Sequence, residues 1–127
     1  MDAKTRKTNI TRVYNKTIAN MQALGTFQAE FEASVRRYSE LRIQYDFLMD
    51  KWYDEGCKIT ESYRNKFGAE NERKTALYLS LETLRKELIE MENLFGLTPK
   101  GLKAIKTKGL ETKKESAIDA ALRNMSG

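Results

Sequence analysis

Proline is almost absent from this 127-residue chain, and that scarcity constrains its fold more than any other feature. The single proline is Pro99, and the seven glycines lie almost entirely between stretches of regularly spaced apolar residues. Because proline interrupts helices and glycine favours their ends, this distribution favours long helices over strands. The sequence therefore predicts an all-α fold within one domain.

The first long helix is expected within residues 27–55, where apolar residues recur at intervals of three and four. Such spacing is typical of a helix that packs lengthwise along another helix. Thr26 is a candidate N-cap, and Gly56 stands where a left-handed residue commonly ends a helix. The apolar stripe of this helix, the first half of the predicted seam, consists of Phe31, Val35, Tyr38, Leu41, Tyr45, Leu48 and Trp52.

A second helix of matching pattern is expected from about residue 70 to residue 95. Residues 56–68 are predicted to form a loop that reverses the chain, so the two helices would make a long antiparallel hairpin with their stripes against each other. The second half of the predicted seam consists of Leu77, Leu81, Leu84, Leu88, Met91 and Phe95.

Shorter helices are expected on both sides of this hairpin. Apolar residues at helical spacing between Ile10 and Leu24 predict an N-terminal helix that docks on it. After Gly96, Thr98 is a candidate N-cap and Pro99 a first helical residue, opening a short helix that ends at Gly109. The predicted organisation is a basic N-terminal arm and helix (1–26), a hairpin that serves as oligomerisation core (27–97), and a basic C-terminal helix and tail (98–127).

Charge is distributed unevenly over these three parts. The formal charge of +5 divides into +4 for residues 1–29 (five basic, one acidic), −3 for 30–97 (11 and 14) and +4 for 98–127 (seven and three). Basic ends of this kind suit a polyanion such as the DNA backbone, although they are equally compatible with solvated termini.

Candidate DNA-binding residues are therefore the basic side chains of the two ends. The N-terminal set is favoured because Asp2 is the only acid before Glu30, whereas the C-terminal lysines soon meet Glu111 and Glu115. The candidates are Lys4, Arg6, Lys7, Arg12 and Lys16 in the N-terminal set, and Lys100, Lys103, Lys106 and Lys108 in the C-terminal set.

The composition weighs against catalysis, cofactors and metals. The chain has no histidine, and Cys57 is its only cysteine, expected to be a small semi-buried residue in a reducing compartment. The carboxylates of Asp46, Asp50 and Asp54 share one helix face, but such stripes are usually solvated. No signal peptide or bilayer-spanning segment is expected, which favours an intracellular, soluble protein.

Several of these features occur together in a known family. An opening helix ending in Leu24-Gly25-Thr26, a long helix with Tyr38-Ser39-Glu40-Leu41 and Tyr45-Asp46, and a second helix ending in Leu94-Phe95 before Gly96-Leu97-Thr98-Pro99 resemble the small subunit of tailed-phage terminases. The resemblance covers about residues 10–106, and the Gly-Leu-Thr-Pro step is its most specific element. Asn71-Glu72 departs from the usual Asn-Pro, and Lys100-Gly101-Leu102-Lys103 stands where the family tends to carry small residues and arginines.

The resemblance implies a ring-forming, non-enzymatic adaptor for DNA packaging in the cytoplasm of an infected bacterial host. Its partners would be double-stranded viral DNA and the large terminase subunit, which carries the ATPase and nuclease. The residues independently favour a homo-oligomer, because Ile43, Phe47, Met49 and Tyr53 lie off the main stripe and need a further apolar partner. The alternative is a structural or regulatory helical hairpin that binds only protein.

Overall fold

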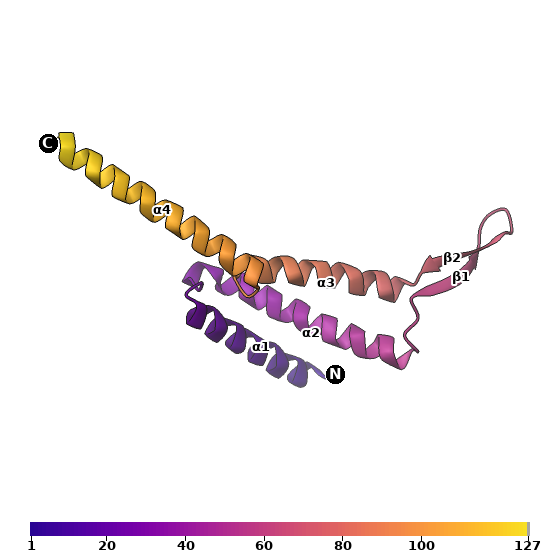
Figure 1. Ribbon diagram of the computed structural model, residues 1–127. Coiled ribbons are helices and arrows are strands. Elements are labelled where there is room, and N and C mark those ends of the chain that lie inside the picture. Colours follow the sequence, from indigo (N-terminus) through magenta and orange to yellow (C-terminus); the bar gives the residue numbers. More distant parts are fainter. Residues whose placement is uncertain (127) are drawn as a thin grey trace.

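A computed structural model describes the backbone of residues 1–126 and, except for 110–117 and 126, their side chains. Figure 1 shows α1, α2 and α3 side by side, with a β-hairpin projecting at one end and α4 leaving at the other. Within the described chain the elements are α1 (Ala3–Leu24), the 3₁₀ helix η1 (Ala29–Phe31), α2 (Glu32–Asp54), β1 (Thr60–Arg64), β2 (Glu70–Lys74), α3 (Ala76–Leu94) and α4 (Pro99–Ser126).

The helices α2 and α3 pack antiparallel, as the sequence predicts. Near the start of α2, the Tyr38 ring meets the Phe95 ring edge-on at a centroid distance of 5.8 Å. Near the other end, the ring centroids of Trp52 and Tyr78 lie 6.2 Å apart. Every residue of the predicted seam is buried or half-buried, Leu84 among the half-buried ones.

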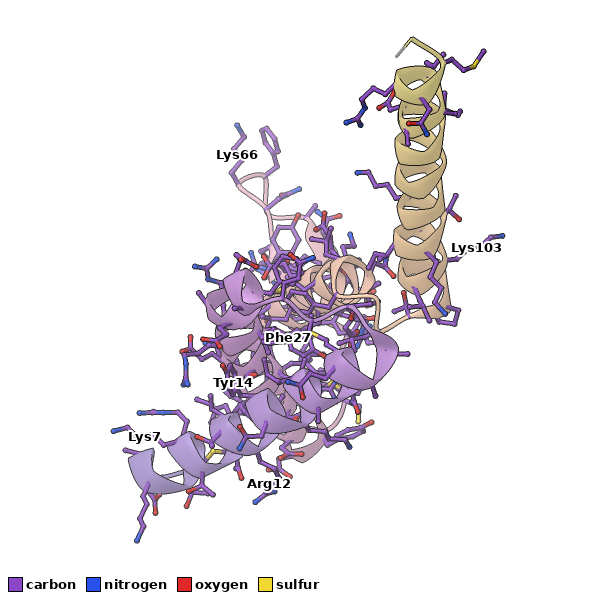
Figure 2. The ribbon with its side chains drawn as sticks, turned by 90° about the vertical axis from the view of Figure 1, so that its left-hand side faces the viewer. Lys7, Arg12, Tyr14, Phe27, Lys66 and Lys103 are labelled. Carbon is purple, nitrogen blue, oxygen red and sulfur yellow. The ribbon has the colours of Figure 1, made fainter. Side chains whose placement is uncertain are left out.

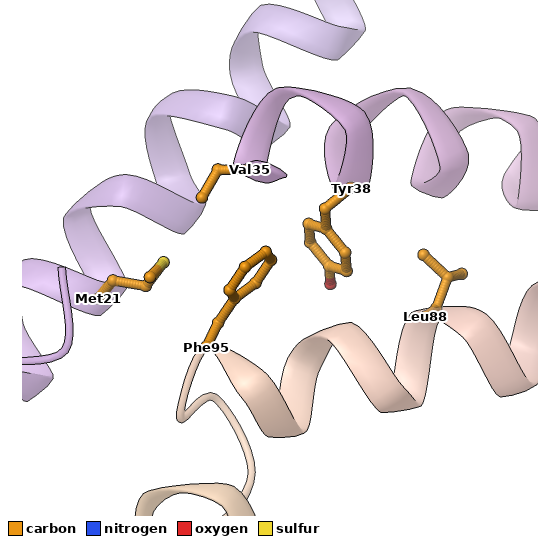
Figure 3. Close-up of a cluster of buried hydrophobic side chains, with 5 residues drawn as sticks. All are labelled: Met21, Val35, Tyr38, Leu88 and Phe95. Atoms are coloured by element: carbon orange, nitrogen blue, oxygen red, sulfur yellow. The ribbon is translucent and has the colours of Figure 1, made fainter. Parts of the chain in front are cut away.

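The core lies where α1 joins this pair. Figure 3 shows its buried side chains converging from three helices: Met21 from α1, Val35 and Tyr38 from α2, Leu88 from α3 and Phe95 from the end of α3. The N-terminal helix α1 thus docks on the helical hairpin formed by α2 and α3, as expected from its apolar spacing.

The all-α prediction is wrong in the connection between the long helices. Strands β1 and β2 pair antiparallel with Ser62 opposite Glu72, in a region that the sequence predicts as a loop followed by helix. The helix α3 accordingly begins at Ala76 rather than near residue 70. Local chemistry explains this start, because the Thr75 hydroxyl accepts a hydrogen bond of 3.1 Å from the Tyr78 amide and caps the helix.

The start of α2 also differs from the prediction. Thr26 does not cap the helix; it is buried, and its hydroxyl donates to the Met21 carbonyl at 3.4 Å. Helical structure begins only at Ala29, as η1. At the other end Gly56 is left-handed, as expected, but Cys57 is also left-handed (φ 60°) and is exposed rather than semi-buried.

The corner between α3 and α4 is closely packed. The Thr98 hydroxyl accepts a hydrogen bond of 3.0 Å from the Gly101 amide, so Thr98 is the predicted N-cap with Pro99 following it. A Cβ on Gly101 would lie 2.7 Å from the Asn93 Cα and carbonyl carbon. A Cβ on left-handed Gly96 would lie 2.8 Å from Thr26 Cγ2. Both glycines are therefore needed for the approach of α4 to the bundle.

The fourth helix is longer than the sequence predicts. It continues through Gly109 to Ser126, so the prediction of a short helix ending at Gly109 is wrong. A glycine inside a helix costs only about 1 kcal/mol relative to alanine, which neighbouring helix-forming residues can offset. Figure 1 shows this helix extending away from the other three.

Candidate nucleic-acid interface

The N-terminal cations lie on the first four turns of α1. Asp2 caps this helix through a hydrogen bond of 2.7 Å from the Thr5 amide, and hydrogen bonds from the Thr5 backbone and hydroxyl lower the pKa of the Asp2 carboxyl. The cap orders the segment that presents the cations. The predicted N-terminal side chains are all exposed: Lys4, Arg6, Lys7, Arg12 and Lys16.

These cations do not share one face of the helix. Arg12 follows Lys7 by five positions, which turns the two side chains about 140° apart on an α-helix. Figure 2 shows them on different sides of α1. The N-terminal set therefore divides into residues that face α2, namely Arg6 and Lys7, and residues that point elsewhere.

Arg6 and Lys7 line a groove between α1 and α2, and α2 contributes a third cation, Arg36. The groove has a volume of about 760 Å³ and also receives the carboxylate of Glu40. The Arg36 guanidinium carbon lies 4.8 Å from the centroid of the Tyr14 ring, a cation–π contact that ties it to α1. We call this part, lined by Arg6, Lys7, Arg36 and Glu40, the basic end of the groove.

Sequence reasoning missed Arg36 because it belongs to the stretch whose summed charge is negative. Arg36 lies just after the first turn of α2, one helix away from the predicted basic arm. A signal was present in the sequence, since Arg36 and Arg37 form a local basic pair next to the apolar stripe. Charge counted by segment cannot reveal which cations from different segments meet in the fold.

The C-terminal lysines lie on the exposed first turns of α4. Lys100, Lys103 and Lys106 recur every three residues and therefore occupy neighbouring positions along one side of the helix, while Lys108 lies further round it. The structure does not bring them together with the N-terminal cluster: Figure 1 shows α4 departing near the C-terminal end of α1, a helix length away from the N-terminus. Glu111 and Glu115 lie outside the described side chains.

An exposed cation beside an exposed aromatic ring, which the sequence did not indicate, lies at the tip of the β-hairpin. Lys66 and Phe67 occupy the turn, and the Phe67 side chain is 84% exposed. The Lys66 ammonium lies 5.3 Å from the centroid of the Phe67 ring. Figure 2 shows Lys66 at the far end of a loop that stands clear of the helices.

An acidic end adjoins the basic end of the groove, at the C-terminal turns of α2. Asp50 and Asp54, from the predicted carboxylate stripe, line a second hollow of about 450 Å³ together with Glu55 and Lys51. Its apolar lining comes from Met1 and Phe47, which also line the larger groove of about 760 Å³. Among the described residues, no cluster of carboxylates or cysteine is arranged to hold a metal ion.

The aromatic and titratable groups between α2 and α3 stabilise the fold. The Tyr38 hydroxyl donates a hydrogen bond of 2.9 Å to the Glu92 carboxylate, which also lies 4.0 Å from an Arg42 nitrogen. Burial, together with this hydrogen bond, raises the pKa of Tyr38 to about 12, so the phenol stays neutral at physiological pH. Tyr45 and Trp52 are half-buried in the same interface, which leaves Phe47 and Tyr53 as the exposed aromatics of α2.

Comparison with known proteins identifies one family. A family model described as phage terminase, small subunit, matches residues 11–112 of this chain. Neither the curated proteins nor the solved structures contain a significant match. Of the described helices, none is both long and apolar enough to cross a membrane.

Proposed function

Because this chain belongs to the phage terminase small-subunit family, with a role in genome packaging, we propose that it is a non-catalytic adaptor that binds double-stranded viral DNA. The observation that carries the DNA-binding part is the basic end of the groove. There Arg6 and Lys7 from α1 and Arg36 from α2 converge on one hollow. Cations fixed on two packed helices lose less side-chain entropy on meeting a phosphate than cations on an unstructured tail.

We further propose that the protein acts as a homo-oligomer, arranged as a ring, and engages the large terminase subunit in the cytoplasm of the bacterial host. Support for assembly comes from apolar side chains that one chain leaves in water. Phe47 and Tyr53 on α2 are 51% and 60% exposed, and Leu94 on α3 is 70% exposed. Ile43 and Met49 support assembly less, because Ile43 is buried within the chain and Met49 is half-buried.

The test is binding of duplex DNA across a salt series, measured by fluorescence anisotropy. The groove variant carries Arg6→Ala, Lys7→Ala and Arg36→Ala, and a second variant carries Lys100→Ala, Lys103→Ala and Lys106→Ala. A control with Arg37→Ala, Lys58→Ala and Lys86→Ala removes the same charge from exposed positions outside the groove. Light scattering coupled to gel filtration verifies that each variant keeps the wild-type mass.

The groove variant should bind more weakly and flatten the slope of log K against log salt by about 0.9 for each phosphate that is no longer neutralised, or by about 2.7 in all. The control should change both quantities much less. If the groove variant binds DNA as the wild type does and the α4 variant loses binding, the DNA-binding surface lies on α4 and not in the groove. If the wild-type protein binds no duplex DNA even at low salt, the adaptor function is wrong and the protein-only alternative takes its place.

A further inference from the structure

The tip of the β-hairpin presents one aromatic side chain on an ordered turn. The Asn65 side-chain oxygen accepts hydrogen bonds from the amides of Phe67 (2.9 Å) and Ala69 (3.0 Å). The Asn65 amide donates to the Ala69 carbonyl, and the Gly68 amide donates to the Asn65 carbonyl, both at 3.0 Å. These bonds close the turn around Phe67 while leaving its ring in water.

The stem that carries this tip is also ordered by side chains. Arg73 forms an ion pair of 3.1 Å with Glu61 across the strands, and its guanidinium carbon lies 4.7 Å from the Tyr63 ring centroid. A two-stranded hairpin is marginally stable alone, so such contacts help to keep it formed. The structure thus holds Phe67 in an exposed position, with the Lys66 ammonium beside its ring.

The acidic end of the groove has the complementary character. Its hollow combines an apolar lining, the side chains of Met1 and Phe47, with the three carboxylates of Asp50, Asp54 and Glu55 and the ammonium of Lys51. The tip combines Phe67 with the cations Lys66 and Arg64, although Glu70 lies opposite Arg64 in the strand register. An aromatic anchor flanked by positive charge therefore matches an apolar hollow flanked by negative charge.

The tip and the hollow of one chain do not meet. Figure 1 shows the hairpin projecting past the ends of α2 and α3, away from α1, and none of its residues is among those that line the hollow. We infer that the β1–β2 tip of one subunit inserts Phe67 into the acidic end of the α1–α2 groove of a second copy of this chain. The contact joins two different surfaces, so it is head-to-tail, and repetition of a head-to-tail contact can close a ring.

This inference rests on the proposed homo-oligomer and specifies which surfaces form it. A nucleic-acid partner for the tip is disfavoured because the three acids of the hairpin nearly cancel its four basic side chains, so residues 60–74 carry a net charge of only +1. A second copy of this chain is favoured as the partner because the same sequence supplies the Phe67 side chain, the hollow at the acidic end and the opposite charges around them.

The test measures the mass of the full chain by light scattering over a dilution series. Three variants perturb the contact: Phe67→Ala, a tip reversal (Arg64→Glu with Lys66→Glu) and a groove reversal (Asp50→Lys with Asp54→Lys). A fourth variant combines both reversals and restores opposite charges with inverted signs. The control, Lys86→Glu, reverses an exposed charge on α3, and circular dichroism verifies that all variants keep their helicity.

Each of the first three variants should raise the dissociation midpoint concentration at least tenfold, as expected for an aromatic anchor or its flanking charges. The combined reversal should restore most of the wild-type affinity between subunits, and the control should match wild type. An independent arm places Phe67→Cys and Phe47→Cys in a Cys57→Ser background, where oxidation should give a ladder of covalent oligomers.

Unchanged midpoints in the single reversals, or no recovery in the combined reversal, would overturn the inference while leaving DNA binding and assembly through another surface intact. Loss of DNA affinity by Phe67→Ala with an unchanged mass would identify the tip as a DNA contact and also overturn it. A wild-type chain that stays monomeric would refute the proposed oligomer itself, and with it this contact.

Discussion

Gly101 and Gly109 lie in the same helix, and replacing each by alanine should change stability in opposite directions. Helix propensity alone favours alanine at both sites by about 1 kcal/mol. At Gly109 nothing lies within 4 Å of the added Cβ, so this gain should be realised. At Gly101 the Cβ would overlap the Asn93 carbonyl oxygen and lie 2.7 Å from the Asn93 Cα and carbonyl carbon, where ordinary contacts measure 3.4–4 Å.

The cost at Gly101 follows from what must move. Backbone cannot rotate out of the way as a flexible side chain can, so the start of α4 must move away from the end of α3. That shift disturbs the hydrogen bond from the Gly101 amide to Thr98 and the packing of Ile105 over Gly96. Overpacking of this kind costs about 3 kcal/mol at the upper end of its usual range. Subtracting the propensity gain leaves a net destabilisation of about 2 kcal/mol for Gly101→Ala.

Thermal unfolding followed by circular dichroism at 222 nm measures both effects, at one fixed protein concentration because assembly contributes to apparent stability. With a shift of about 4 °C per kcal/mol for a chain of this size, Gly101→Ala should lower the Tm by about 8 °C and Gly109→Ala should raise it by about 4 °C. If Gly101→Ala melts at or above the temperature of Gly109→Ala, the close approach of α4 to Asn93 is not part of the folded protein.

Two further predictions concern the interface between α2 and α3. Leu81→Ala should lower the free energy of unfolding by about 2–5 kcal/mol because Leu81 is 1% exposed, while Leu79→Ala, at a site 48% exposed, should cost much less; equal costs in urea denaturation would contradict the assigned faces of α3. Folding raises the pKa of Tyr38 from its usual 10 to about 12, so the stability it contributes should be complete below pH 10 and be lost as the pH rises through 12. Tyr38→Phe should weaken the fold near neutral pH by about 1 kcal/mol and remove this part of the alkaline loss; an unchanged alkaline loss would show that another group causes it.

The helical pairing could be predicted because burial imposes its period on the sequence. Leu81 and Leu88 are separated by an interval of seven residues that places them on one face of α3, and the structure buries both. The cap at Thr98 could also be predicted, since a hydroxyl before proline satisfies free amides through local chemistry alone. Such features need no knowledge of the rest of the chain.

The β-hairpin could not be predicted by the same reasoning. Its strands are exposed at every position except Tyr63, so burial gives them no alternating apolar pattern. What stabilises them is the Asn65 turn and cross-strand pairs such as Arg73 with Glu61. The prediction that Thr26 caps α2 was wrong for a different reason. Thr26 is suited to cap the helix, but it packs against Gly96, which lies 70 residues further along the sequence.

The distribution of charge along α2 bears on both proposed surfaces. Arg36 lies near the N-terminus of the helix, and Asp54 and Glu55 lie at its C-terminus. The helix dipole disfavours the carboxylates of Asp54 and Glu55 at the C-terminus by about 0.3–1 kcal/mol each, whereas Glu32 in the first turn and Lys51 in the last turn have the favoured signs. Helix stability therefore does not explain why Asp54 and Glu55 stand at this end. The basic end draws Arg6 and Lys7 from residues 1–29, whereas the carboxylates of the acidic end come from residues 30–97, whose summed charge is −3 (11 basic, 14 acidic). Binding of phosphate at the basic end and of a basic hairpin tip at the acidic end would neutralise the charges of both ends. The two sets of variants test this arrangement.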